Sequence, residues 1–512
     1  MKRASFWAKS GKNRDPLATD VVQSDLKVRS VRSGLITFAA QPVKFALGVG
    51  STAILARLLQ PEDFGLVAMV TPLLVLVDSI SNLGLETAIV HKAQLNPQQA
   101  SAIFWLSLKI NAFVIGGMVL MAPVLAWFYG RGELVGIVLM MAVGAFALCA
   151  AFQHKSLLQR QLRFGILTTI EVVSTVLGAF VGVFAAWRGF GYWSLVLQLV
   201  VMQVSNSTAY WFACDWRPAR AIASQPQADL GQMISYGAHL TGFRFLTRFG
   251  KQLDRVLIGY FSGAAALGLY SVAYNWAYFP FDQIYNPMFN VAVASLSRAH
   301  EDPQSYRLYC RRGLLLLFSL CMPALAFLFV EARPVILVLL GEKWLEAIPL
   351  FRLLLIAVFV GSLFRVTKWL YVSAGQTQRQ FRWALIHTPV SIVAIAIGAG
   401  WGSFGVALGY TVAICLLTVP SVVYCLKFSA FGVEDFFKTA VRPIFASTGA
   451  AAILFFGSAF LPPINPPIAA LIVKGTGFGI CYLLLWLVPL GDGQDPILSL
   501  KTLITSYRQF RK

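Results

Sequence analysis

The segment "FRFLTRFGKQLDRVLIGYF", residues 243–261, places basic side chains inside an apolar stretch that is long enough to cross a membrane. Arg244, Arg248, Lys251 and Arg255 are spaced so that they share one face of an α-helix. A single cation at the bilayer centre costs about 2.5–3.5 kcal/mol on the insertion scale. We therefore expect this face to line an aqueous cavity, and so basic a cavity favours an anionic cargo. A short amphipathic helix at the membrane interface is the alternative.

The composition is that of a membrane protein. Of the 512 residues, 57% are hydrophobic and 12% are charged, and the mean hydropathy is +0.69. These values predict a polytopic all-α membrane protein with the lipid bilayer as its solvent. The net charge of +20 raises the question of nucleic-acid binding. The basic residues are dispersed among apolar runs, without zinc-finger spacing or an aromatic RNA-binding signature, so we expect no nucleic-acid partner.

The chain contains about fourteen apolar stretches, and most have the ~20 residues that a membrane-spanning helix needs. They lie near residues 34–57, 65–89, 99–125, 134–154, 165–187, 191–213, 234–261, 266–292, 313–333, 347–374, 383–401, 404–426, 441–461 and 468–490.

The distribution of basic residues predicts the orientation of these spans. With the amino terminus inside, the cytoplasmic tails and loops hold 27 of the 42 Lys and Arg residues, and the exported loops hold five. This asymmetry follows the positive-inside rule and places both termini in the cytoplasm. The seven cysteines lie in spans or at their cytoplasmic ends, so we expect no disulfide framework.

An internal repeat predicts two lobes. "DFGLVAMVTP" from Asp63 is similar to "ALGLYSVAYN" from Ala266, and "GFGYWSLVLQ" from Gly189 is similar to "SFGVALGYTV" from Ser403. Because each copy has an even number of spans, both have the same orientation in the membrane. The predicted organisation is a basic cytoplasmic tail (1–33), an N-lobe of six spans (34–213), a cytoplasmic linker (214–233), a C-lobe of six spans (234–427), an appended pair of spans (441–490) and a second cytoplasmic tail (491–512).

Catalytic signatures are absent from the sequence. There is no P-loop, the five histidines lack metal-ligand spacing, and no loop is long enough to form a folded domain. We therefore expect no catalytic residue, no metal and no cofactor, and we predict that the protein is not an enzyme. The helix bundle itself must carry the function.

Further charges inside spans extend the candidate site. Lys44, Arg365 and Lys368 join the basic stripe as candidates for a cationic lumen, although Lys368 could instead extend to the interface. Asp78 and Asp282 occupy similar places in the two copies and are candidates for coupling transport to a proton or sodium ion. A salt bridge to a neighbouring cation is the other use of each carboxylate. Tyrosines and Trp276 crowd residues 270–285. Aromatic side chains there can stack on sugar rings, make helix contacts or form an interfacial belt, and we favour the belt.

Four segments together resemble the Wzx-type polysaccharide flippases of the multidrug/oligosaccharidyl-lipid/polysaccharide (MOP) exporter superfamily. They are "ILARLLQPEDFGLVAMV" from Ile54, "LLQRQLRFGILTTIEVVS" from Leu157, "TRFGKQLDRVLIGYFSGAAALGLYSVAY" from Thr247 and "GEKWLEAIPLFRLLL" from Gly341. The resemblance covers roughly residues 30–430. It implies fourteen helices in two six-helix lobes around a central cavity, plus two terminal helices. It also implies translocation of undecaprenyl-pyrophosphate-linked oligosaccharide across the bacterial inner membrane, with a polysaccharide polymerase and a chain-length regulator as partners.

The resemblance and the charges agree, because Arg binds phosphate oxygens in a bidentate manner and a cationic lumen would accept a pyrophosphate. Two alternatives stay open. A lipid II-type flippase or a multidrug exporter shares the superfamily fold, although an exporter of cationic drugs would need an acidic lumen. A membrane polysaccharide polymerase or ligase would act on the same lipid-linked sugars, but it would need a sizeable exported loop with catalytic residues.

Overall fold

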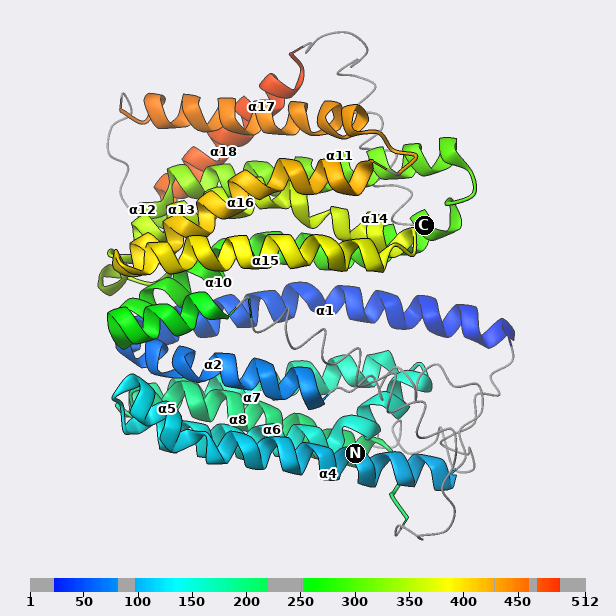
Figure 1. Cartoon of the computed structure of the whole chain (residues 1–512), viewed down its shortest axis with the longest axis vertical. Helices are drawn as coiled ribbons and strands as arrows, with labels where there is room; N and C mark the ends of the chain where they lie inside the picture. The colour runs from blue at the N-terminus through cyan, green and yellow to red at the C-terminus, as the bar shows by residue number, and fades with distance from the viewer. Residues whose placement is uncertain are drawn as a thin grey trace, which may run out of the picture. The chain divides into compact units, whose positions relative to one another are not determined.

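The computed structural model describes residues 23–81, 97–219, 250, 252–427, 429–459 and 467–488. Every regular element in these residues is a helix (Figure 1). Ten helical segments of the described chain are long and apolar enough to cross a membrane. The chain is an all-helical, multi-span membrane protein, and the predicted fold class is confirmed.

The helices form two compact units, Met1–Gln252 and Leu253–Lys512. In the first unit, α4 and α5 together occupy the third predicted span, and the other helices occupy one span each. The helices of this unit are α1 (Gln23–Leu58), α2 (Pro61–Ser81), α4 (Pro97–Leu120), α5 (Ala122–Tyr129), α6 (Glu133–Arg160), α7 (Phe164–Trp187) and α8 (Trp193–Ala213).

The second unit contains the end of the seventh predicted span, spans eight to twelve and the appended pair. Its helices are α10 (Leu253–Arg298), α11 (Pro303–Val330), α12 (Ala332–Leu339), the 3₁₀ turn η1 (Glu342–Trp344), α13 (Ala347–Arg365), α14 (Thr367–Ser373), α15 (Thr377–Ala399), α16 (Gly402–Leu426), α17 (Val433–Gly457) and α18 (Pro467–Trp486). The predicted linker at 214–233 lies largely outside the described residues, as does most of the seventh predicted span at 234–261.

Gly263 divides α10 into a short first part and a long second part. Its φ of 79° is in the left-handed region, which glycine reaches without the clash that a Cβ would cause. The sequence places the turn between the seventh and eighth spans at the same position. The short part of α10 is therefore the end of the seventh span, and the long part, 264–298, is the eighth.

Corresponding helices pack in the same way in the two units. In unit 1, α8 packs against α6 and α7, and in unit 2, α16 packs against α13 and α15. Both final pairs pack almost backbone to backbone. A Cβ on Gly178 of α7 would lie 2.6 Å from the carbonyl oxygen of Gln198, and one on Gly398 of α15 would lie 2.1 Å from that of Gly405. Small residues at close helix contacts are typical of membrane proteins, and their recurrence supports the duplication.

The appended helices dock on unit 2. α17 packs against α11 and α18 (Figure 1), and Lys474 of α18 forms an ion pair with Glu331, the residue that precedes α12. The Nζ atom of Lys474 lies 2.9 Å from one carboxylate oxygen of Glu331 and 3.1 Å from the other. Because Glu331 is 3% exposed, this pair is an internal tie and not a surface contact.

Candidate functional site: an intramembrane cation held by an aromatic stripe

An aromatic stripe runs along the long part of α10. Tyr270, Tyr274, Tyr278 and Tyr285 recur at one-turn or two-turn spacing, so they share a helix face. The Tyr274 and Tyr278 rings stack with centroids 4.4 Å apart, and the Tyr285 ring stacks on Phe281 at 5.2 Å. Three of the four tyrosines are at most 7% exposed. The interfacial-belt interpretation is therefore wrong for these residues, because they pack inside the unit along several turns.

Arg365, the last residue of α13, lies against this stripe. Its guanidinium carbon is 4.5 Å from the Tyr278 ring centroid and 5.2 Å from that of Phe281. Its Nη1 atom is 2.6 Å from Oδ1 of Asp282. The Tyr285 hydroxyl donates a 2.9 Å hydrogen bond to the Arg365 backbone carbonyl. We call these four partners of Arg365 (Tyr278, Phe281, Asp282 and Tyr285) the Arg365 cage. Two aromatic faces, one carboxylate and one hydrogen bond to the backbone carbonyl therefore fix the position of the guanidinium.

The stripe also contacts a second cation and a second helix. The Nζ atom of Lys368, in α14, lies 4.9 Å from the centroid of Phe289, one turn beyond Tyr285. The structure thus brings the predicted candidates Arg365 and Lys368 to the same stripe. The Tyr278 and Tyr410 hydroxyls are 2.5 Å apart and connect α10 to α16. Sequence reasoning missed Tyr410, which no spacing pattern connects to α10.

Arg255 is the one member of the basic stripe within the described residues. Its guanidinium carbon lies 5.5 Å from the Tyr274 ring centroid, so this cation also meets the aromatic stripe. The neighbouring Asp254 is buried and accepts hydrogen bonds of 2.7 Å from the Tyr270 hydroxyl and from the Arg255 backbone N–H. Arg244, Arg248 and Lys251 lie outside the described residues.

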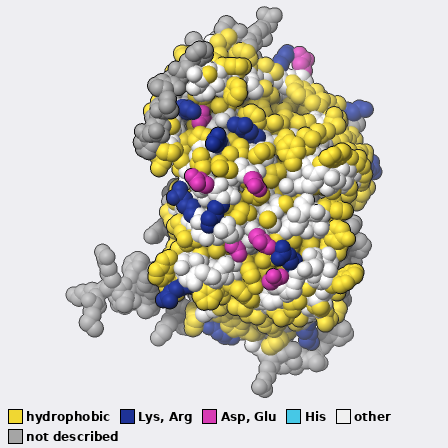
Figure 2. Space-filling view, turned by 90° about the vertical axis from the view of Figure 1, so that its left-hand side faces the viewer, with side chains coloured by type: hydrophobic (Ala, Val, Ile, Leu, Met, Phe, Trp, Pro, Cys, Tyr) yellow, Lys and Arg dark blue, Asp and Glu magenta, His cyan; other side chains and the backbone are white. Residues whose placement is uncertain are grey.

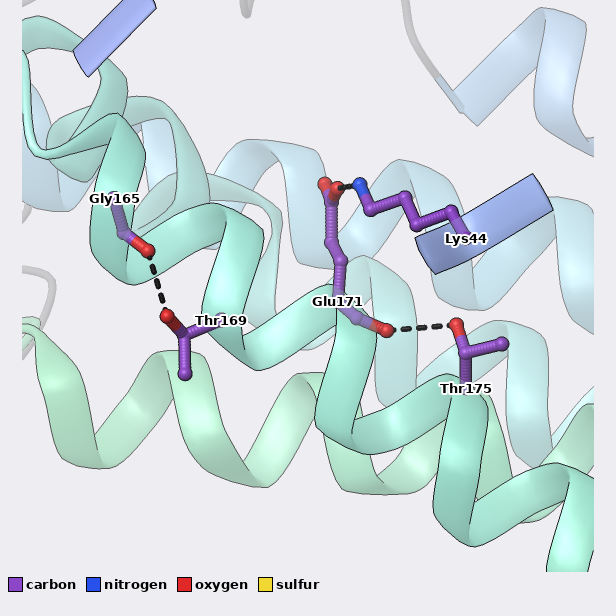
Figure 3. A network of polar contacts seen from close by, with 5 residues as sticks. All are labelled: Lys44, Gly165, Thr169, Glu171 and Thr175. Carbon is purple, nitrogen blue, oxygen red and sulfur yellow. Dashed lines mark hydrogen bonds and ion pairs between the residues drawn. The ribbon is translucent and has the colours of Figure 1, made fainter. Parts of the chain in front are cut away.

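Unit 1 contains an ion pair between α1 and α7. Figure 3 shows the Lys44 side chain extending to Glu171, and its Nζ atom is 2.5 Å from Oε2. The Glu171 backbone carbonyl accepts a hydrogen bond from the Thr175 hydroxyl, one turn further along α7. The candidate cation Lys44 thus has an acidic partner that the sequence did not assign to it.

The two candidate coupling carboxylates have different surroundings. Asp282 is the ion-pair partner of Arg365, which is the use that the sequence left open beside ion coupling. Asp78 is exposed on α2. The two residues lie in different units. Among the residues that the structure describes, no group of three or more His, Cys, Asp or Glu side chains could hold a metal ion.

Figure 2 shows acidic and basic side chains exposed on a surface dominated by hydrophobic groups. Charged side chains on a membrane protein are costly in lipid, so they indicate pairing or contact with water. Lys44 and Arg365, which each pair with a carboxylate, follow this rule.

Solved structures with a similar fold are transporters. The lipid II flippase MurJ, in an inward closed conformation, matches with a TM-score of 0.66 and 13% identity over 89% of this chain and 98% of that chain. An inward-facing multidrug resistance MATE family transporter of the MOP superfamily matches with a TM-score of 0.58 and 12% identity over 80% and 98%. The chain thus shares its fold with these two transporters.

Sequence comparison gives the family. The profile of the family "Polysaccharide biosynthesis protein" matches residues 54–349, more than half of the chain, and the chain belongs to this family. The teichuronic acid biosynthesis protein TuaB of Bacillus subtilis (strain 168) is 26% identical over 86% of this chain and 90% of its own length. The lipopolysaccharide biosynthesis protein WzxC of Escherichia coli (strain K12) is 21% identical over 78% and 82%. The chain is therefore a multi-span member of the polysaccharide biosynthesis protein family, with a fold that solved transporters share.

Proposed function

We propose that this transporter moves undecaprenyl-pyrophosphate-linked oligosaccharide repeat units across the bacterial inner membrane for exopolysaccharide or lipopolysaccharide assembly. The observation that carries the proposal is Arg365, a guanidinium inside a candidate span that aromatic faces and a backbone anchor hold in place. A guanidinium offers several N–H donors in a fixed fork that matches phosphate oxygens. Such a group suits the one part of a lipid-linked glycan that hydrocarbon would reject, its pyrophosphate.

We give the remaining candidate cations the same proposed role. Lys44, Arg244, Arg248, Lys251, Arg255 and Lys368 are the further proposed contacts for the charged head. Their dispersal favours several weak contacts over one tight site, and weak contacts permit release on the far side. The acyl tail needs no polar contact, because it can stay in lipid.

The cellular setting follows from the same proposal. Both termini lie in the cytoplasm, as the 27-to-5 distribution of basic residues predicts. The cargo enters from that side, where the lipid-linked unit is assembled, and leaves towards a polysaccharide polymerase and a chain-length regulator. TuaB and WzxC support a role in polymer assembly, since they are named for the biosynthesis of teichuronic acid and of lipopolysaccharide.

Two alternative cargoes, lipid II and a cationic drug, are compared with the lipid-linked oligosaccharide. A lipid II-type cargo has the same pyrophosphate but a different glycan, and a cationic drug would be repelled by Arg365 and Lys368. The experiment reconstitutes the protein in vesicles with undecaprenyl-pyrophosphate-linked oligosaccharide and measures how fast the glycan becomes accessible to an externally added glycosidase. We expect transport of the oligosaccharide lipid above that of protein-free vesicles. Faster transport of lipid II, or of a cationic dye, would assign the chain to that alternative cargo.

A further inference from the structure

Two intramembrane ion pairs differ from a third in how accessible they are. In the Arg365–Asp282 pair the side chains are 33% and 41% exposed, and in the Lys44–Glu171 pair they are 25% and 35% exposed. In the Lys474–Glu331 pair Lys474 is 21% exposed, but the carboxylate side chain is only 4% exposed and both of its oxygens contact Lys474. The first two pairs are accessible and joined by one close N–O contact each. The third is closed.

In the Arg365 cage, the groups that hold the guanidinium in position differ from the group that neutralises its charge. The two aromatic faces and the Tyr285 hydrogen bond hold the residue without using its charge for an ion pair. Asp282 alone supplies the opposite charge within the cage. Removing that carboxylate from contact would therefore leave the guanidinium in place, with N–H donors turned to whatever anion replaced it.

A cation that binds a travelling anion inside a membrane has two conflicting requirements. Without any counter-ion it would carry the cost of a bare charge in the bilayer, about 2.5–3.5 kcal/mol on the insertion scale. With an anionic cargo and no competitor, it would bind too tightly for release. An accessible carboxylate answers both requirements, because it neutralises the empty site and competes with the cargo when the site is filled.

We propose that Asp282 is the resident counter-ion of Arg365, and that the phosphate group of the cargo displaces it during transport. Glu171 has the same relation to Lys44 in unit 1. This proposal rests on the proposed function. It adds that the phosphate group binds by replacing a carboxylate at each of the two cations. Asp282 thus sets the affinity for the cargo's phosphate group and the rate of its release. It does so through its ion pair with Arg365 and not by touching the cargo.

The test uses the full-length protein in detergent with geranylgeranyl pyrophosphate as the probe and geranylgeraniol as its uncharged control. A partly exposed ion pair is typically worth up to about fivefold in an equilibrium, so we expect Asp282→Asn to bind the pyrophosphate about fivefold more tightly than the parent. Asp282→Glu keeps the counter-ion and should bind like the parent. Arg365→Gln should lose most of the preference for the pyrophosphate over the alcohol.

The matched control is Glu331→Gln, which removes the carboxylate of the closed pair and should leave pyrophosphate affinity unchanged. In vesicles, Asp282→Asn should transport the oligosaccharide lipid more slowly despite tighter binding, because release becomes difficult. If folded Asp282→Asn binds the pyrophosphate like the parent while Arg365→Gln binds it more weakly, the anion exchange is overturned. The proposed function would then still stand. A parent protein that binds the pyrophosphate and the alcohol equally would overturn both.

Discussion

The hydroxyl of Tyr278 lies 2.5 Å from the hydroxyl of Tyr410, and the face of the same Tyr278 ring lies against Arg365. One tyrosine therefore ties α10 to α16 with its polar end and supports an intramembrane cation with its ring. The two contacts can be separated, because Phe keeps the ring and removes the hydroxyl.

We expect Tyr410→Phe to lower the free energy of unfolding by about 1–3 kcal/mol, since it leaves the buried Tyr278 hydroxyl without this partner. Tyr278→Phe should cost a similar amount. The double variant should cost less than the sum, because each single change already breaks the shared bond. Thermal unfolding in detergent measures all three, with the exposed Tyr309→Phe as control. Fully additive losses would contradict a bond between the two hydroxyls.

The close contact of α15 and α16 predicts a strict size limit. A Cβ added at Gly398 would lie 2.1 Å from the carbonyl oxygen of Gly405, so the two helices must separate to admit it. We expect Gly398→Ala to destabilise the protein by about 1–3 kcal/mol, the usual cost of overpacking. Gly477→Ala is the control, because a Cβ there meets nothing within 4 Å. Equal melting temperatures for the two variants would show that the helices are not in such close contact.

The basic stripe should be accessible to water. Cysteine placed at 244, 248, 251 or 255 should react with a small hydrophilic thiol reagent in active protein, because the cost of a cation in lipid directs this face towards water. The measurement is the extent of labelling by mass spectrometry in a cysteine-free background. Phe245 and Phe249, each next to one of these positions, provide the comparison. Labelling only at positions 245 and 249 would contradict the prediction, because the basic face would then not be the one that faces water.

Charge should matter more than shape at the stripe. We expect Arg248→Lys to keep substantial export, Arg248→Gln to lose more and Arg248→Glu to lose most, because each step weakens or reverses the attraction to pyrophosphate. Export of surface polysaccharide at matched protein levels measures the effect. Three variants with equal export would remove Arg248 from headgroup binding.

An ion gradient should drive net transport, because the sequence contains no nucleotide-binding motif. Displacement of Asp282 from Arg365 by the cargo would make this carboxylate available to a coupling ion, as is typical of acidic residues inside transporters. Collapsing the proton and sodium gradients in loaded vesicles should slow translocation, and Asp78→Asn or Asp282→Asn should reduce that sensitivity. If ionophores do not change the translocation rate of the parent protein, transport is instead facilitated diffusion. Consumption of the cargo by polymerisation would then drive it.

The sequence alone predicted the class of fold and the identity of several candidate residues. Apolar stretches predicted the helices that the structure describes at most spans, and the turn between the seventh and eighth spans falls at Gly263, as expected. Arg365 and Lys44 could be singled out because the cost of a charge in a membrane depends on the residue and its immediate neighbours. Composition, hydropathy and charge asymmetry are local properties, and they are readable without coordinates.

Only the tertiary structure decided which charges meet. Arg365 and Asp282 are 83 residues apart, and Lys44 and Glu171 are 127 apart. Tyr410 reaches Tyr278 from a helix 132 residues further along the chain. No period of 3.6 residues connects such positions, because each contact depends on which helix faces of different spans pack together. The energy of an ion pair falls with distance and with exposure, so the roles of these residues follow from the packing and not from the order of the sequence.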